Sequence, residues 1–282
     1  MATVPVLRRF CRESYNPPEA LYEKLKRLGL DLVTVTDHDS IEAGESLRRH
    51  PDFFLSEEVT CRAPSGNEVH VGVYDITESQ HVEIQRRRND LPRLVAYLEE
   101  QQVFFSVNHI FSALTGRRAA EDFDWFEACF PAVEVLNGHL LARNNHLASR
   151  LASHARRITV GGSDAHALRS AGSVWTEVRE ARNKAEFLEA LRAGRAHVRG
   201  ESGNYWKLTS DILAVSCEMF RENPFTLLLA PLLVGIPAVT LINHLVERRF
   251  ARKWGQAWAR MRGLDGGAAV RPIPAAAREA TA

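Results

Sequence analysis

From its start to about residue 200, the chain alternates short apolar runs with amphipathic stretches. The run at 32–35 is mostly β-branched and uncharged, which is typical of a strand buried on both faces of a sheet. Further strands are predicted at 53–62, 68–74, 103–107, 132–136 and 158–162, and a good turn sequence at 64–67 joins the first two. Stretches with one apolar face predict helices at 16–29, 41–49, 83–101, 121–129, 140–155 and 184–194. This alternation predicts an α/β fold with parallel strand pairing and helices on both faces.

The pattern changes in the last third of the chain. Residues 223–246 carry no Asp, Glu, Lys or Arg, and this stretch is long enough to cross a bilayer. Basic residues follow between 248 and 253, which favours the inner, anionic face of a membrane. We therefore predict that residues 223–253 contact membrane lipid, as a re-entrant or hairpin insertion beginning with 206–220. The alternative is a soluble helical pair packed on the α/β domain.

These patterns divide the chain into three parts. Residues 1–204 form the predicted α/β domain, and residues 205–262 form a hydrophobic helical extension. The tail at 263–282 is rich in Gly, Ala and Pro and is expected to be disordered.

Composition narrows the functional class. The formal net charge of the 282 residues is +1, so nothing in the chain suggests a basic nucleic-acid-binding protein. Its four cysteines are scattered, which indicates reduced thiols rather than a disulfide framework. The first residues lack the apolar core of a signal peptide. We expect a cytoplasmic protein that associates with the inner face of the membrane.

Metal-ligating residue types stand at the ends of several predicted strands. Asp37, His38 and Asp39 follow the run at 32–35, and His70 lies on the strand at 68–74. The other candidates are Glu58, His109, Asp164 and His166. Carboxyl ends of strands meet on one face of barrel-like α/β folds, so these side chains are expected to converge. Histidine and carboxylate ligands without thiolate favour zinc, manganese or iron.

In order along the chain, four stretches resemble motifs of the PHP (polymerase and histidinol phosphatase) family. They are 29–40, 58–60 together with 68–70, 107–109 and 162–166, and the strand end at 134–137 is also similar. The resemblance covers about residues 12 to 200. It implies a distorted (β/α)7 TIM-like barrel and a metal-dependent phosphoesterase that acts on a small phosphorylated substrate.

The resemblance also implies roles for the candidate residues. Glu58 would bridge two of two or three divalent metal ions, with His70 and His109 completing the second metal and Asp164 binding the first. His38 and His166 would hold the third. Asp37 and Asp39 match motif positions and would complete the catalytic group by orienting His38. The implied reaction is hydrolysis by a metal-bound hydroxide.

One motif of the family is missing, because no histidine precedes His38. If the motif aligns with 8–10, both of its imidazoles are replaced, and the first metal keeps only Glu58 and Asp164. Alternatively, Met1 is an internal start and the first strand lies upstream, which the intact later motifs favour. In either case, we expect fewer metal ions and slower turnover.

Two further functions remain open at this point. The chain could be a catalytically degenerate PHP module that acts as a membrane-associated binding or scaffold protein, or a metallohydrolase that acts on a C–N bond. Asn137 and Arg143 are candidate substrate-binding residues near one strand end. His139 and His146 flank the same region and are expected on a helix surface.

Overall fold

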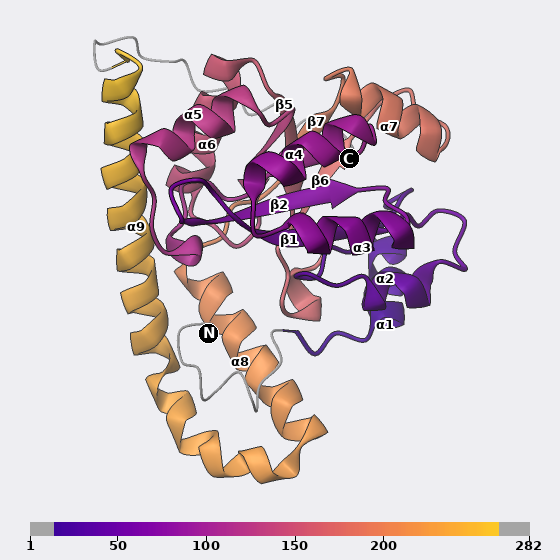
Figure 1. The fold of residues 1–282 in the computed structure, drawn as a ribbon. Coiled ribbons are helices and arrows are strands. Elements are labelled where there is room, and N and C mark those ends of the chain that lie inside the picture. The colour runs from indigo at the N-terminus through magenta and orange to yellow at the C-terminus, as the bar shows by residue number, and fades with distance from the viewer. Residues whose placement is uncertain (1–13, 265–282) are drawn as a thin grey trace, which may run out of the picture.

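The computed structural model describes residues 14–264 of the chain (Figure 1). Residues 8–10, with which the missing motif could align, and the predicted tail beyond residue 264 lie outside the described range. The first half contains α1 (Pro18–Arg27), α2 (Glu42–Leu47), β1 (Ser56–Arg62), β2 (Glu68–Tyr74), α3 (Glu78–Arg87), α4 (Leu91–Glu100), β3 (Phe104–Val107) and η2 (Ala113–Thr115). The second half contains α5 (Ala120–Ala128), β4 (Ala132–Asn137), α6 (Ala142–Ala155), β5 (Ile158–Gly162), η3 (Leu168–Ser170), β6 (Val174–Glu177), α7 (Lys184–Arg192), β7 (His197–Gly200), α8 (Tyr205–Glu222), η4 (Pro224–Gly235) and α9 (Ile236–Met261).

The predicted α/β class is confirmed, but the sheet is mixed. Its strand order is β1-β2-β3-β4-β5, with parallel pairing only between β3, β4 and β5. The prediction of parallel pairing is wrong for β1, β2 and β3, which pair antiparallel. The reason is the short turn at 64–67, where Gly66 takes a φ of +81° and reverses the chain after β1.

Within residues 14–264 the sheet does not close into a barrel. The predicted strand at 32–35 makes a single isolated parallel bridge, Val33 to Phe53, and a second isolated bridge follows it, His38 to Glu58. Beyond β5, β6 and β7 form a separate antiparallel pair. A cavity of about 1860 Å³ is lined both by residues 29–38 and by β5 and β6. The predicted strand end therefore lies on the wall of an open cavity.

Helices cover the sheet and bury its apolar residues. Val59, Val71 and Val107 are fully buried on β1, β2 and β3. The helix predicted at 83–101 is in fact two helices, α3 and α4. The chain breaks between them because Asp90 caps the second helix by accepting a hydrogen bond from the Arg93 amide, and Pro92 suits its first turn.

The C-terminal extension is a helical hairpin anchored at one end. Figure 1 shows α8 and α9 side by side, leading away from the sheet to η4. The C-terminal half of α9 packs on α5 and α6, where Trp258 is fully buried and donates a hydrogen bond to Glu127 (2.6 Å). A Cβ on Gly255 would come within 2.7 Å of Leu147, so this part of α9 lies close to α6.

The far end of the hairpin exposes large apolar side chains. Phe225, Leu228 and Val234 are 86%, 85% and 87% exposed. Among the described residues, one helical segment, 224–261, has the length and composition to cross a membrane. Soluble proteins seldom leave such a cluster uncovered.

Candidate metal centre

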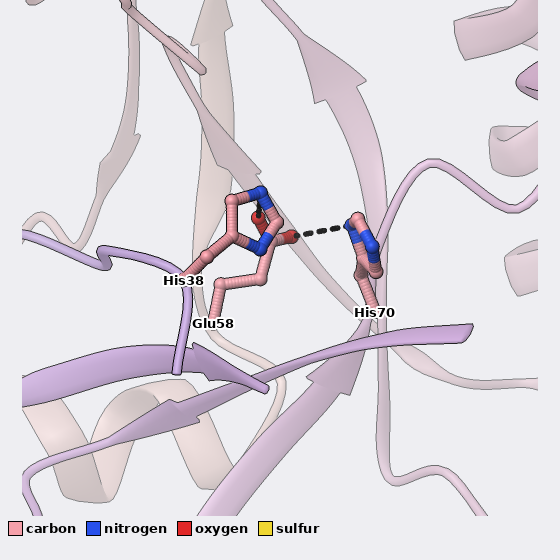
Figure 2. Close-up of side chains that lie close together, drawn as sticks. All are labelled: His38, Glu58 and His70. Carbon is pink, nitrogen blue, oxygen red and sulfur yellow. Dashed lines mark ion pairs between the residues drawn. The ribbon is translucent and has the colours of Figure 1, made fainter. Parts of the chain in front are cut away.

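Three histidines from separate parts of the chain converge on Glu58, and Figure 2 shows two of them, His38 and His70. His38 Nε2 lies 3.3 Å from Glu58 Oε2. On the other carboxylate oxygen, Oε1, His109 Nε2 lies at 3.2 Å and His70 Nδ1 at 3.8 Å. The predicted convergence of these four side chains is therefore present in the fold.

Local backbone pairing places the first two of these residues together. The amide of Asp39 donates to the carbonyl of Glu58 (2.9 Å), and the amide of Glu58 donates to the carbonyl of Asp37 (3.1 Å). His38 therefore lies beside β1 and faces Glu58 across one bridge. Glu58 itself lies within β1 rather than at its end, and His70 lies within β2, one strand away.

Three residues around the site have left-handed backbone. The φ angles are 55° at Asp39, 32° at His109 and 48° at Asp164. Residues other than glycine seldom adopt this conformation, and such strain tends to occur where function requires it. At His109 and Asp164, the turn directly after a strand brings the side chain to the site.

Asn108 holds the carboxylate at the centre of the cluster. Its Nδ2 donates to Glu58 Oε1 (2.8 Å), and its Oδ1 accepts a hydrogen bond from the Ser106 hydroxyl (2.7 Å). All three residues are buried. This chain of contacts fixes one oxygen of Glu58 and leaves the other facing His38.

The donor set fits divalent cations. His70 Nδ1 and His109 Nε2 are only 3.1 Å apart while both face Glu58. Convergence of several imidazole nitrogens and one carboxylate is the ligand chemistry of zinc and related metals. The buried Nδ1 atoms of His38 and His109 have no hydrogen-bond partner in the described structure. The side chains of His38, Glu58 and His70 each offer an atom within 4.8 Å of the others.

Electrostatics within the cluster favour ligation. Burial would raise the pKa of Glu58, but the hydrogen bond from His109 and the electrostatic interaction with the neighbouring histidines hold it well below its usual range. Burial lowers the pKa of His70 to about 3, so this ring is neutral and has a lone pair at physiological pH. Burial also works against charging His109, yet its contact with Glu58 raises that pKa to about 9. A cation bound beside Glu58 would take the place of the proton that His109 otherwise carries.

The other predicted ligands lie at the ends of β4 and β5. Asn137 Nδ2 donates to Asp164 Oδ2 (3.0 Å) and to both oxygens of Glu134 (3.1 and 3.2 Å). His166 Nδ1 lies 3.7 Å from Asp164 Oδ1. Loss of solvation would raise the pKa of Asp164, but His166 and His139 lower it below its usual range.

Asp39, Asn137 and Arg143 make other contacts than the sequence analysis implied. Asp39 accepts a hydrogen bond from the Thr60 amide (2.9 Å) and pairs with Arg88, while Asp37 lines the cavity. The amide group of Asn137 bonds to protein groups on both sides, as its Oδ1 accepts from His139 and Leu140. Arg143 is exposed on α6 and does not line the cavity.

The sequence analysis assigned no role at the site to three polar residues, Glu134, His139 and Asp211. Glu134 is buried, and burial raises its pKa to about 7; its Oε2 accepts from the His109 amide (2.9 Å). His139 does not lie on a helix surface as expected. Its Nε2 is hydrogen-bonded to Asp211 Oδ2 of α8 (2.8 Å). His139 lies two residues after Asn137, where β4 ends, and this position was the sequence feature that could have marked it as a site residue.

Comparison with known proteins gives one family match and several similar folds. A family model described as PHP-associated matches residues 142–196. PsfC from Pseudomonas syringae PB-5123 is 16% identical over 73% of this chain and 93% of its own, with a TM-score of 0.54. A proposed metal-dependent phosphoesterase from Bifidobacterium adolescentis is 16% identical over 64% of this chain and 92% of its own, with a TM-score of 0.45. The lesion-specific endonuclease PfuEndoQ from Pyrococcus furiosus is 17% identical over 67% of this chain and 56% of its own, with a TM-score of 0.49.

No curated protein matches the chain in sequence. The similarity to PsfC shows that the α/β fold is one found in a solved structure. The matched segment at 142–196 overlaps the last motif of the PHP resemblance, at 162–166. The family model and the order of motifs thus agree over this segment of the chain.

Proposed function

We propose, on the premise that this chain carries a PHP domain, that it is a metal-dependent hydrolase of phosphate esters. The observation that supports this most directly is the convergence of His38, His70 and His109 on Glu58. The mixed sheet, with residues 31–38 along its edge, would then be an opened form of the distorted (β/α)7 barrel. A small phosphorylated substrate would enter through the cavity on which His38 and Glu58 lie.

Each residue of the cluster has a definable task. Glu58 offers two oxygens and is therefore suited to bridge two cations, with His70 and His109 on one of them. When bound, divalent cations such as zinc, manganese or iron lower the pKa of water and stabilise charge on phosphoryl oxygens. Asp37 lines the cavity and is exposed, so its carboxylate can accept the proton of the attacking water. Asn108 keeps Glu58 oriented throughout.

The extension supports a second part of the proposal, contact with a membrane. Phe225, Leu228 and Val234 are exposed at the far end of the hairpin, and basic side chains at 248–253 follow on α9. An apolar end flanked by basic residues suits shallow insertion into an anionic bilayer. This arrangement would place the catalytic domain at the inner face of the membrane.

Activity and metal content test the catalytic part. The full chain, freed of metal by chelation, should hydrolyse p-nitrophenyl phosphate only after Zn²⁺ or Mn²⁺ is restored. Glu58→Gln should reduce kcat/KM by at least ~100-fold, because a shared ligand is lost, whereas loss of groups outside the ligand sphere costs about 10- to 100-fold. Glu189→Gln, at a side chain 78% exposed on α7, is the matched control and should leave kcat/KM unchanged.

Two results would contradict the proposal. One is activity that survives both chelation and Glu58→Gln. The other is absence of hydrolysis with every divalent metal and with both monoester and diester substrates, which would favour the degenerate module. Hydrolysis of amide substrates alone would instead favour the C–N hydrolase.

A further inference from the structure

A second group of ligand side chains, outside the cluster on Glu58, lies where β4 and β5 end. We propose that His139, Asp164 and His166 hold a divalent cation, and that Asp211 of the C-terminal extension fixes the ring of His139 for this task. The inference rests on the proposed metal dependence for its setting. Binding at this site, however, can be measured without any catalytic activity.

The backbone brings His139 to this position. The amide of Gly138 donates to the carbonyl of Gly162 (3.0 Å), so the turns after β4 and β5 lie side by side. A Cβ on Gly138 would come within 2.7 Å of the Ser163 carbonyl, which shows how closely they approach. The His139 amide donates to Asn137 Oδ1 (2.9 Å), which fixes the direction of the turn.

The three side chains are spaced for a shared ion. His139, Asp164 and His166 each offer a ligand atom within 4.8 Å of the other two. The rings of His139 and His166 are stacked, with centroids 5.5 Å apart and planes 11° apart. Asp164 lies beside both, and its carboxylate is held by Asn137.

Asp211 determines which nitrogen of His139 is available. This carboxylate is 2% exposed, and its Oδ2 lies 2.8 Å from His139 Nε2. The Ser170 hydroxyl donates to the same oxygen. When Nε2 carries the proton of this contact, Nδ1 carries the lone pair. A carboxylate on the far nitrogen is the usual support of a metal-ligating histidine, since it orients the ring and raises its basicity.

Two imidazoles and one carboxylate suit zinc or a similar cation. A set of three protein ligands leaves a coordination position open for water or for a substrate oxygen. The alternative is that His139 is protonated and simply pairs with Asp211, as an internal ion pair between α8 and the turn after β4. In that case, His139 would contribute nothing to metal binding.

Metal stoichiometry of the full chain separates the two. Chelated protein is loaded with Zn²⁺, freed of excess, and its metal content measured by elemental analysis, with Co²⁺ absorption as a second readout. His139→Ala should bind one equivalent less than the wild-type chain and lose part of the visible Co²⁺ spectrum. His146→Ala, on the exposed face of α6, is the matched control and should bind as the wild-type chain does.

Further variants define the role of each residue. Asp211→Asn should keep the site but weaken its affinity for Zn²⁺ by about 10- to 100-fold, as expected for a positioning residue. Glu58→Gln should lose metal from its own cluster and keep the equivalent that depends on His139. If His139→Ala does not fold, as judged by circular dichroism, His166→Ala gives the same comparison.

The inference is overturned if His139→Ala and His166→Ala bind as much Zn²⁺ as the wild-type chain with equal affinity. It is also overturned if the folded wild-type chain binds none. A chain that loses one equivalent with His139→Ala but hydrolyses no phosphate ester would keep this site and refute the proposed function.

Discussion

Glu247 on α9 lies 3.0 Å from the hydroxyl of Ser112, which follows the candidate ligand His109 by three residues. The same carboxylate accepts hydrogen bonds from the Ala113 amide (3.0 Å) and from Asn144 Nδ2 (2.8 Å). The side chain is 5% exposed. The long helix of the extension therefore holds the loop that leaves the metal centre.

This buried carboxyl should make stability depend on pH. Burial raises the pKa of Glu247 in the folded state above its ordinary value. The folded state thus keeps a proton that the unfolded state has already lost, so the contribution of Glu247 to stability is full below the unfolded pKa and falls as pH rises. We expect Glu247→Gln, which cannot ionise, to lack this decline. Urea unfolding of the wild-type chain and of Glu247→Gln from pH 4 to pH 7 gives the free energy of unfolding as a function of pH. If it changes equally with pH in both proteins, the expectation is contradicted.

Asn108 should matter for metal affinity more than for stability. Replacing Asn108 by Ala removes the donor to Glu58 Oε1 and should weaken Zn²⁺ binding by about 10- to 100-fold. Asn183→Ala, which removes the N-cap of α7 at the surface, is the control. It should cost about 1 kcal/mol of stability and leave Zn²⁺ affinity unchanged. Equal Zn²⁺ affinities for the two variants, measured by competition with a chelating dye, would refute the role of Asn108.

The exposed end of the hairpin should bind lipid. Phe225→Glu combined with Leu228→Glu should reduce flotation with phosphatidylglycerol-containing vesicles by at least ~10-fold, because two apolar side chains are lost and the anionic bilayer repels the two added carboxylates. Val82→Glu, on an exposed position of α3, should float as the wild-type chain does. If the wild-type chain instead forms a dimer that the double variant disrupts, this surface is a contact between copies and not a lipid-binding one.

Much of the fold could be predicted from hydrophobic periodicity. The strands at β3, β4 and β5 and the helices at α5, α6 and α7 lie within a few residues of their predicted ranges. Periodicity alone could not show that β1 and β2 form a hairpin, and the turn sequence at 64–67 between them was the signal for it. Nor could it show that the stretch at 32–35 makes only one isolated bridge, at Val33, because strand pairing depends on residues far along the chain.

The candidate site was predictable only where chemistry and position coincided. His109 and Asp164 each follow a buried strand, and Glu58 and His70 belong to recognisable motifs. Asp211 gave no such signal, because it is one acidic residue in an amphipathic helix and only folding brings it to His139. Glu134 lies within a buried strand, so its sequence could not show which groups face it.

The two helices of the hairpin reach the α/β part of the protein at separate points. Asp211 comes from α8 and Glu247 from α9, while Trp258 packs edge-on against Phe111 and Trp254 packs against Phe123. A chain ended at residue 204 would thus lose the acceptor of the His139 ring and leave aromatic side chains in water. A displacement of the hairpin would therefore reach both groups of candidate ligands directly.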